Sequence, residues 1–246
     1  MNAFQQGGRR GIMGMPPVVL NLIIINALLL MITKLFMDNI NLYEVLGLYY
    51  VASDNFQTWQ FVSYMFMHGD FYHLLFNMFA LWMFGAVLEN VWGPKRFLTF
   101  YMVTGIGAGF VQLLVAYIRI KALEGAISPD NLQLIYDNGH ELWQQGRTYS
   151  DAAMSSLHRI LNTPTVGASG AVFGILLAFG MLFPNTMIYV FFAIPIKAKY
   201  FVLIYGVAEL YFGVTGTMDG IAHFAHLGGM VFGYFMIKYW RSKGVY

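Results

Sequence analysis

Six apolar runs, separated by polar or aromatic segments, constrain the fold of this chain more than any other feature of its sequence. They cover residues 18–36, 71–91, 97–118, 169–183, 200–214 and 221–240. A helix of about 20 apolar residues crosses the roughly 30 Å hydrocarbon core of a bilayer. Hydrophobic residues make up 58% of the chain and charged residues 11%, against about 25% charged residues in a soluble domain. We therefore expect an all-α, polytopic membrane protein with six transmembrane helices.

The segments outside these runs divide the chain into one membrane domain and its extensions. We expect a cytoplasmic tail at 1–17, a six-span domain at 18–240 and a second cytoplasmic tail at 241–246. Residues 119–164 form the one strongly polar section, and their apolar spacing predicts one or two amphipathic helices at the membrane surface. Residues 184–198 are apolar but contain two prolines, so we expect a connector that lies against the membrane.

Lysine and arginine are unevenly distributed between the two sides of the predicted bundle. With the N-terminus inside, the inner segments hold nine of the 14 basic residues and one acid, Glu89, whereas the outer segments hold ten of the 12 acids. Cytoplasmic loops carry the excess of lysine and arginine. The pattern therefore predicts that both chain ends are cytoplasmic, in a multi-pass protein of the cell (inner) membrane, and that residues 119–164 lie outside.

A serine stands among small residues at the beginning of the fourth run. The fifteen residues from Ser169 to Phe183 rise about 22 Å as a helix, about 8 Å less than the hydrocarbon core, so this helix is expected to start below the outer surface. His226 and Asn77 each lie about six residues into their own runs, roughly 9 Å below the same surface. The three side chains are thus predicted to share one depth.

Glycine pairs permit the two helices that carry the serine and the histidine to approach closely. The pairs are Gly170 and Gly174 in the fourth run and Gly229 and Gly233 in the sixth. Within hydrogen-bond reach, His226 would take the hydroxyl proton of Ser169 during attack on a carbonyl and return it to the leaving amine. His73, Asn77 and the backbone N–H of Ser169 would donate to the oxyanion. No aspartate obviously orients His226, so the sequence favours a dyad over a triad.

Each of these residues also has a purely structural explanation. Ser169 taken alone fits small-residue helix packing, and its frame is GASG and not GxSxG. His226 taken alone fits a polar tether between spans, while His68, His73 and His223 fit an interfacial position or a loop contact. An ionisable residue inside a membrane span is nevertheless a functional hypothesis by default, and the shared depth favours chemistry.

Three motifs, in order and on alternate runs, carry a resemblance to a known family. They are HGDFYHLLFNM at 68–78, GASGAVFG at 167–174 and AHLGGMVFG at 225–233. They resemble the three hallmark motifs of the rhomboid intramembrane serine proteases, of bacterial type, and the resemblance extends over about residues 18–240. A six-span, rhomboid-like bundle is the fold that it implies.

The resemblance also implies residue roles and a reaction. It implies that Ser169 is the nucleophile, His226 the general base, and His73 and Asn77 the oxyanion stabilisers. The reaction would be cleavage of transmembrane segments of membrane-protein substrates near their outer end. The helix of the fifth run and the loop 215–219 would act as a gate and a cap.

Two features depart from the family pattern. Phe173, four residues after the serine, stands where well-studied members have a tyrosine, and we expect its ring to pack against His226. Phe173, together with Gly167 and Gly170 on either side of the serine, is predicted to support the catalytic residues. The insertion 119–164 is longer than the family minimum, and the first loop lacks an evident Trp-Arg pair.

Two other functions compete with an intramembrane serine endopeptidase. A small polytopic transporter would place its polar residues near the midplane, often in both halves of a repeat, and no repeat is evident here. A catalytically inactive rhomboid-like protein that binds membrane clients would lack Ser169 or His226. Transmembrane proteins and the lipid bilayer are the expected partners, and nucleic acid is not. The chain has no cysteine, which excludes a cysteine metal site. Histidine and carboxylate could in principle bind zinc, but there is no HExxH motif, and we expect neither a metal nor another cofactor.

Overall fold

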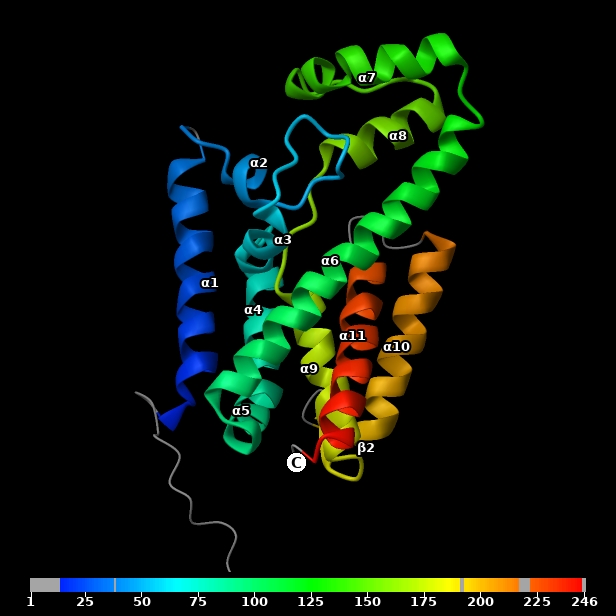
Figure 1. Ribbon diagram of the computed structural model, residues 1–246. Coiled ribbons are helices and arrows are strands. Elements are labelled where there is room, and N and C mark those ends of the chain that lie inside the picture. The colour runs from blue at the N-terminus through cyan, green and yellow to red at the C-terminus, as the bar shows by residue number, and fades with distance from the viewer. Residues whose placement is uncertain (1–13, 38, 191–192, 217–221, 245–246) are drawn as a thin grey trace, which may run out of the picture.

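The computed structural model describes residues 14–37, 39–190, 193–216 and 222–244, and it is built almost entirely of helices (Figure 1). The helices of the bundle are α1 (Pro17–Phe36), α4 (Phe71–Ala80), α5 (Ala86–Trp92), α6 (Pro94–Glu124), α9 (Ser169–Leu182), α10 (Ala198–Thr215) and α11 (His223–Ser242). The short elements before α4 are α2 (Leu42–Leu46), α3 (Gln60–Ser63) and the single turn η2 (Tyr64–Phe66). A π-helical segment, η3 (Leu81–Gly85), joins α4 to α5.

Three helices are long and apolar enough to cross a membrane, and they lie at Pro17–Phe36, Phe71–Trp92 and Pro94–Glu124. The second is the continuous helix formed by α4, η3 and α5. A shorter apolar helix, α9, has 14 residues and begins at Ser169. The predicted class, a polytopic helical membrane protein, is therefore confirmed. The count of six crossings stays a prediction.

The centre of the bundle lies where α6, α9 and α11 meet. A Cβ added at Gly229 would lie 1.8 Å from the carbonyl oxygen of Gly170, so α9 and α11 are in backbone contact at this point. Phe100 of α6 is fully buried next to Gly233 and Trp240 of α11. The contact allows the first turns of α9 and α11, which carry Ser169 and His226, to lie side by side.

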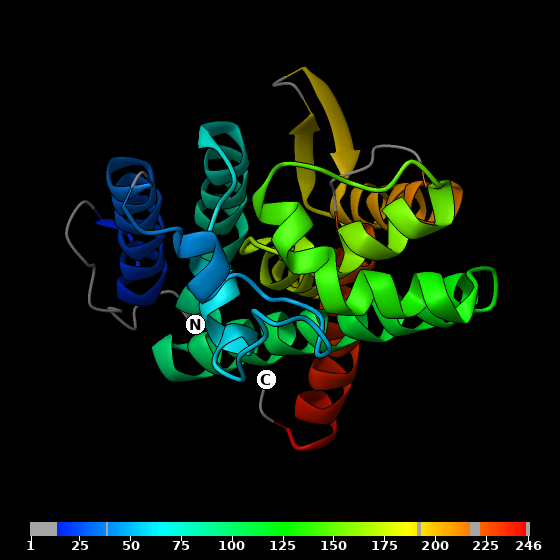
Figure 2. The same ribbon diagram turned by 90° about the horizontal axis from the view of Figure 1, so that it is seen from above.

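The segment 119–164 lies at one end of the bundle (Figures 1 and 2). It forms two helices, α7 (Pro129–Gln144) and α8 (Ala152–Asn162). They share a separate apolar cluster with the end of α6 and the loop before α3, composed of Tyr50, Ile120, Ile127, Ile135, Met154, Leu157 and Leu161. Because Ile120 belongs to this cluster, α6 continues to Glu124, six residues beyond the predicted end at 118.

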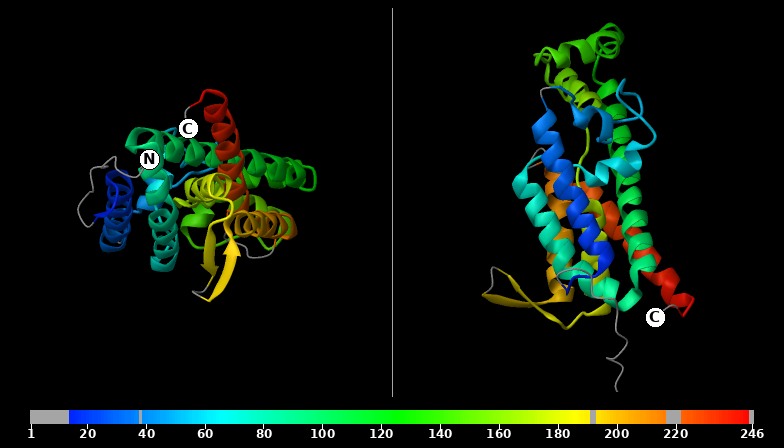
Figure 3. Two further views of the ribbon diagram at one scale, coloured as in Figure 1. Left: turned by 90° about the horizontal axis from the view of Figure 1, so that it is seen from below. Right: turned by 90° about the vertical axis from the view of Figure 1, so that its left-hand side faces the viewer.

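The opposite end of the bundle carries a β-hairpin, β1 (Met187–Val190) and β2 (Ile194–Lys197), which projects sideways (Figure 3). The strands are antiparallel, and Tyr189 pairs with Pro195. The sequence predicts a connector that lies against the membrane here, and the structure shows that this connector forms a hairpin. Proline is tolerated because both strands of a two-stranded ribbon are edge strands.

The beginning of α1 and the end of α11 lie at the same end of the molecule as this hairpin (Figures 1 and 3). This is the arrangement expected if both chain ends lie on one side of the membrane. Of the two predicted tails, residues 1–13 and 245–246 lie outside the described residues. The same holds for residues 217–219 of the predicted cap loop.

The first turn of α1 is anchored by Glu89 of α5. The two carboxylate oxygens accept hydrogen bonds from the backbone N–H groups of Val18, at 3.0 Å, and Val19, at 2.8 Å. These N–H groups have no partner within their own helix, because the first four donors of a helix are always left over. Glu89 is buried, and its negative charge also complements the positive end of the helix dipole.

Candidate active site

Ser169 and His226 lie within hydrogen-bond distance of each other inside the bundle. The Oγ atom of Ser169 is 2.7 Å from Nε2 of His226. Ser169 is the first residue of α9, and His226 lies in the first turn of α11. The chain descends from α8 alongside the bundle before α9 begins, so the serine lies deeper than the α7–α8 end of the molecule (Figure 1).

Gly167 shapes the backbone that leads into the serine. Its φ angle of +131° belongs to a region that side chains rarely adopt, and its N–H donates to the carbonyl oxygen of Tyr64 at 2.9 Å. A Cβ at this position would lie 2.8 Å from Nε2 of His73. Backbone conformation and space therefore both require glycine here. Gly170 is similarly enclosed, since its Cβ would lie 2.5 Å from the Cβ of Ala108.

His73 and Asn77 lie one turn apart on α4. Nδ1 of His73 accepts a hydrogen bond from the Gly69 N–H at 3.4 Å, and its Nε2 lies close to Gly167. Nδ2 of Asn77 donates to the carbonyl oxygen of His73 at 2.9 Å, which leaves the second amide hydrogen for another acceptor. The structure thus brings His73 next to the segment that precedes Ser169. The oxyanion role of both residues stays a prediction.

His68 packs against His73 with ring centroids 5.0 Å apart. Its side chain is fully buried, and within the described part of the chain neither ring nitrogen has a hydrogen-bond partner. Burial lowers the pKa of His68 to about 3, with a smaller contribution from His73. A neutral His68 therefore supports the position of His73 by packing.

The ring of Phe173 stacks on the imidazole of His226. The centroids are 4.3 Å apart, and the planes differ by 4°. This is the contact that the spacing of Phe173 from Ser169 predicts, because residues four apart lie on the same face of a helix. Its effect on catalysis stays a prediction.

Glu209 of α10 is the functional candidate that the sequence analysis missed. Its Oε2 atom lies 2.9 Å from Nδ1 of His226 and 2.7 Å from Nδ1 of His223. The sequence analysis found no aspartate that obviously orients His226; the acid in contact with it is a glutamate from the preceding helix. An acid in the middle of an apolar run is itself a signal, because such residues are rare in membrane spans.

The same three residues are also the candidate metal ligands among the residues that the structure describes. One ligand atom each from Glu209, His223 and His226 lies within 4.8 Å of the other two. Two imidazoles and a carboxylate are an ordinary zinc ligand set. Here the three side chains are already joined by hydrogen bonds, and these bonds account for their close approach without an ion.

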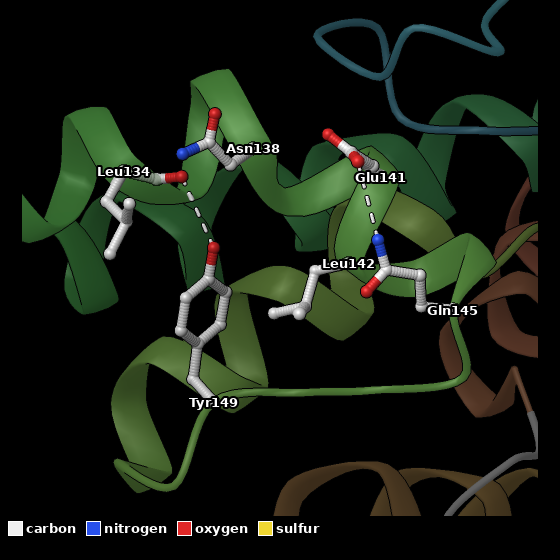
Figure 4. A pocket seen from close by; sticks show the side chains of 6 residues that line it. All are labelled: Leu134, Asn138, Glu141, Leu142, Gln145 and Tyr149. Carbon is white, nitrogen blue, oxygen red and sulfur yellow. Dashed lines mark hydrogen bonds between the residues drawn. The ribbon is translucent and has the colours of Figure 1, made fainter.

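A separate pocket lies on α7 and the turn that follows it (Figure 4). It is lined by Leu134, Asn138, Glu141, Leu142, Gln145 and Tyr149. The Tyr149 hydroxyl donates to the carbonyl oxygen of Leu134 at 3.2 Å across it. The pocket belongs to the 119–164 segment and contains none of the predicted site residues.

The sequence was also compared with known protein families and with curated proteins. The family model described as "Rhomboid domain" matches residues 55–121 and 147–243, which is more than half of the chain. The unmatched residues between these parts, 122–146, include the whole of α7.

Several curated proteins are similar to this chain. RHOMBOID-like protein 12, mitochondrial, of Arabidopsis thaliana is 28% identical over 215 residues, which cover 86% of this chain and 55% of the relative. Rhomboid protein 1, mitochondrial, of Saccharomyces cerevisiae is 28% identical over 181 residues, with coverages of 73% and 41%. Rhomboid protease GlpG of Yersinia pestis is 30% identical over 78 residues, with coverages of 32% and 28%. The chain thus spans about half the length of the first two relatives. These matches support the family and not the narrower bacterial type.

Proposed function

The chain belongs to the rhomboid family, and from this we propose that it is an intramembrane serine endopeptidase that cleaves transmembrane segments of protein substrates near their outer end. The observation that carries the proposal is the 2.7 Å contact between Ser169 and His226 inside a helical bundle. A serine hydroxyl is a weak nucleophile unless an adjacent base takes its proton. The histidine is in position to be that base.

The chemistry begins when Oγ of Ser169 attacks the carbonyl carbon of a substrate peptide bond. The hydroxyl proton passes to Nε2 of His226, and the negative charge on the substrate oxygen is stabilised by donors from His73, Asn77 and the Ser169 N–H. His226 then returns the proton to the leaving amine, and an acyl-enzyme remains. The same histidine activates the water that releases the second product.

The route by which a substrate would enter the site is inferred from the resemblance to the rhomboid family. The helix α10 and the loop 215–219 would serve as gate and cap, and residues 217–219 of that loop lie outside the described residues. Large apolar side chains on the outer face of α10 support contact with lipid and with a substrate helix. They include Leu203, Ile204, Val207, Leu210, Tyr211 and Val214.

The apolar helices make the chain an integral membrane protein, in which a bilayer surrounds the bundle. The distribution of lysine and arginine supports a cytoplasmic location for both chain ends in a cell inner membrane. The names of two relatives assign those proteins to mitochondria. Imaging of a tagged protein in its native cell, with markers for both compartments, distinguishes the two.

A fluorophosphonate probe and a transmembrane substrate in liposomes test the proposed activity. Wild-type protein is expected to take up the probe and cleave the substrate, whereas Ser169→Ala and His226→Ala each abolish cleavage while the protein remains folded. The double variant is expected to be no worse than either single variant, because nucleophile and base act as a unit. Labelling that persists in Ser169→Ala would refute the assignment. A folded wild-type protein that neither labels nor cleaves would instead support a client-binding role.

A further inference from the structure

We propose that Glu209 is a positioning residue for His226, so that the site works as a Ser169–His226–Glu209 triad. The proposal rests on the proposed protease function and adds a residue that the predicted dyad does not contain. Oε2 of Glu209 lies 2.9 Å from Nδ1 of His226, and Oγ of Ser169 lies 2.7 Å from Nε2 of the same ring. Both ring nitrogens are therefore engaged, on opposite sides of the imidazole.

The carboxylate selects the tautomer that the reaction needs. An ionised carboxylate only accepts hydrogen bonds, and a neutral imidazole has one donor and one acceptor nitrogen. A donor at Nδ1 for Glu209 leaves Nε2 as the acceptor that faces the Ser169 hydroxyl. The opposite tautomer would present two acceptors to each other at Nδ1 and would leave the serine proton without a base.

His223 makes the buried carboxylate tolerable. Glu209 is 9% exposed, and a charge in an apolar region is stable only when hydrogen-bonded partners surround it. His223 supplies a second donor at 2.7 Å to the same oxygen. Its other nitrogen, Nε2, is buried without a partner in the part of the chain that the structure describes. A proton there would be an unsatisfied donor, so the neutral form of His223 with its proton on Nδ1 fits the site.

Three contacts then hold the histidine ring. Ser169 and Glu209 fix it within its own plane, and Phe173 covers one face at 4.3 Å. Without Glu209, the ring would keep the stacking contact with Phe173 and the hydrogen bond with Ser169. The orientation of the ring would then be less restricted. When His226 accepts the proton, it also gains a positive charge in a site of low dielectric, and the Glu209 carboxylate supplies the opposite charge. Both effects act on turnover more than on substrate binding.

Kinetics of Glu209→Gln and Glu209→Asp in the full-length protein in liposomes test the proposal. Glutamine keeps the size but loses the charge and can donate to Nδ1, which favours the wrong tautomer. We expect kcat to fall about 100-fold or more in Glu209→Gln, with KM changed by less than about threefold. Aspartate keeps the charge and is expected to recover part of the loss. Glu141→Gln, which removes a carboxylate on α7 outside the bundle, is the matched control and should behave as wild type.

Proton NMR of protein with 15N-labelled histidine provides a readout that needs no activity. In a Ser169→Ala background, we expect far-downfield N–H signals from the Nδ1 protons of His223 and His226, and both are expected to shift strongly or disappear on Glu209→Gln. The NMR measurement also tests the role of Glu209 when a variant melts at a lower temperature, because it does not depend on activity. A wild-type kcat in Glu209→Gln, or unchanged imidazole signals, would overturn the role of Glu209. A wild-type protein without protease activity would overturn the proposed function, and the NMR result would still test the contact.

Discussion

At the scale of single residues, the orientation of the His226 ring depends on stacking with Phe173, whose side chain has no hydroxyl group. Phe173→Tyr should retain nearly wild-type turnover, because the stacked ring is kept and the hydroxyl is not needed for the contact. Phe173→Ala should lower turnover about 100-fold, since it frees the imidazole and a small misplacement of a catalytic group has an effect of that size. Turnover of one transmembrane substrate, with a melting curve for each variant, is the measurement. Full activity in Phe173→Ala would mean that Ser169 and Glu209 alone position His226.

The oxyanion role of Asn77 can be separated from its structural role by a second asparagine. Asn77→Ala should lower turnover about 10- to 1,000-fold, the range for one oxyanion donor, while probe labelling of Ser169 persists. Asn26 makes the same kind of bond within its own helix, from Nδ2 to the carbonyl oxygen of Leu22 at 2.7 Å. Asn26→Ala is therefore the control for loss of such a bond far from the serine. Equal turnover in the two variants would remove Asn77 from the oxyanion site.

Residue pairs differ in how far the sequence could predict them. The pairing of Ser169 with His226 was accessible because helix rise gives depth, and glycine spacing gives the face on which two helices meet. Glu209 was not accessible in the same way. Its contact depends on the rotation and register of α10 against α11, which arise from packing among several helices and leave no periodic trace in one segment.

At the scale of elements, the position of α1 depends on one carboxylate from a different helix. Glu89→Ala should lower the free energy of unfolding by about 2–4 kcal/mol, because it removes two hydrogen bonds to a charged group and leaves one buried and one half-buried N–H group unsatisfied. Denaturation in detergent, followed by helix content, measures the change. Glu141→Ala, on the surface of α7, is the control and should change stability by less than about 0.5 kcal/mol. A similar loss in both variants would contradict the anchoring role of Glu89.

The predicted boundaries of helices agree with the structure where the apolar pattern alone determines the helix end. They differ where a contact with another element determines it. The start of α9 at Ser169 matched, because the small residues before it do not continue a helix. The end of α6 did not, since Ile120 packs into the α7–α8 cluster and holds the helix beyond the predicted membrane boundary. The β1–β2 hairpin was missed because its pattern of apolar residues and prolines is equally compatible with an irregular connector.

At the scale of the whole molecule, the proposed topology places α7 and α8 outside the cell. Arg147 is exposed in the turn after α7, so trypsin added to intact cells should cut there. Arg147→Gln should remove that fragment, which provides the control for the site. The cut protein should remain active, because Ser169, His226 and Glu209 all lie outside the segment and a single cut after Arg147 leaves α9, α10 and α11 intact. Cleavage that occurs only in inverted vesicles would reverse the orientation.

The helices α9, α10 and α11 follow one another in the chain, and each contributes one member of the proposed triad. The chain order is therefore serine, acid, histidine, as in the α/β-hydrolases, and it differs from the orders in chymotrypsin and subtilisin. In the hydrolases, these groups stand on turns of a sheet-based fold, whereas here they stand on three successive helices in a membrane bundle. The proposed triad would thus have the same linear order on a different architecture. A shared order of catalytic groups along a chain is therefore no evidence of common descent.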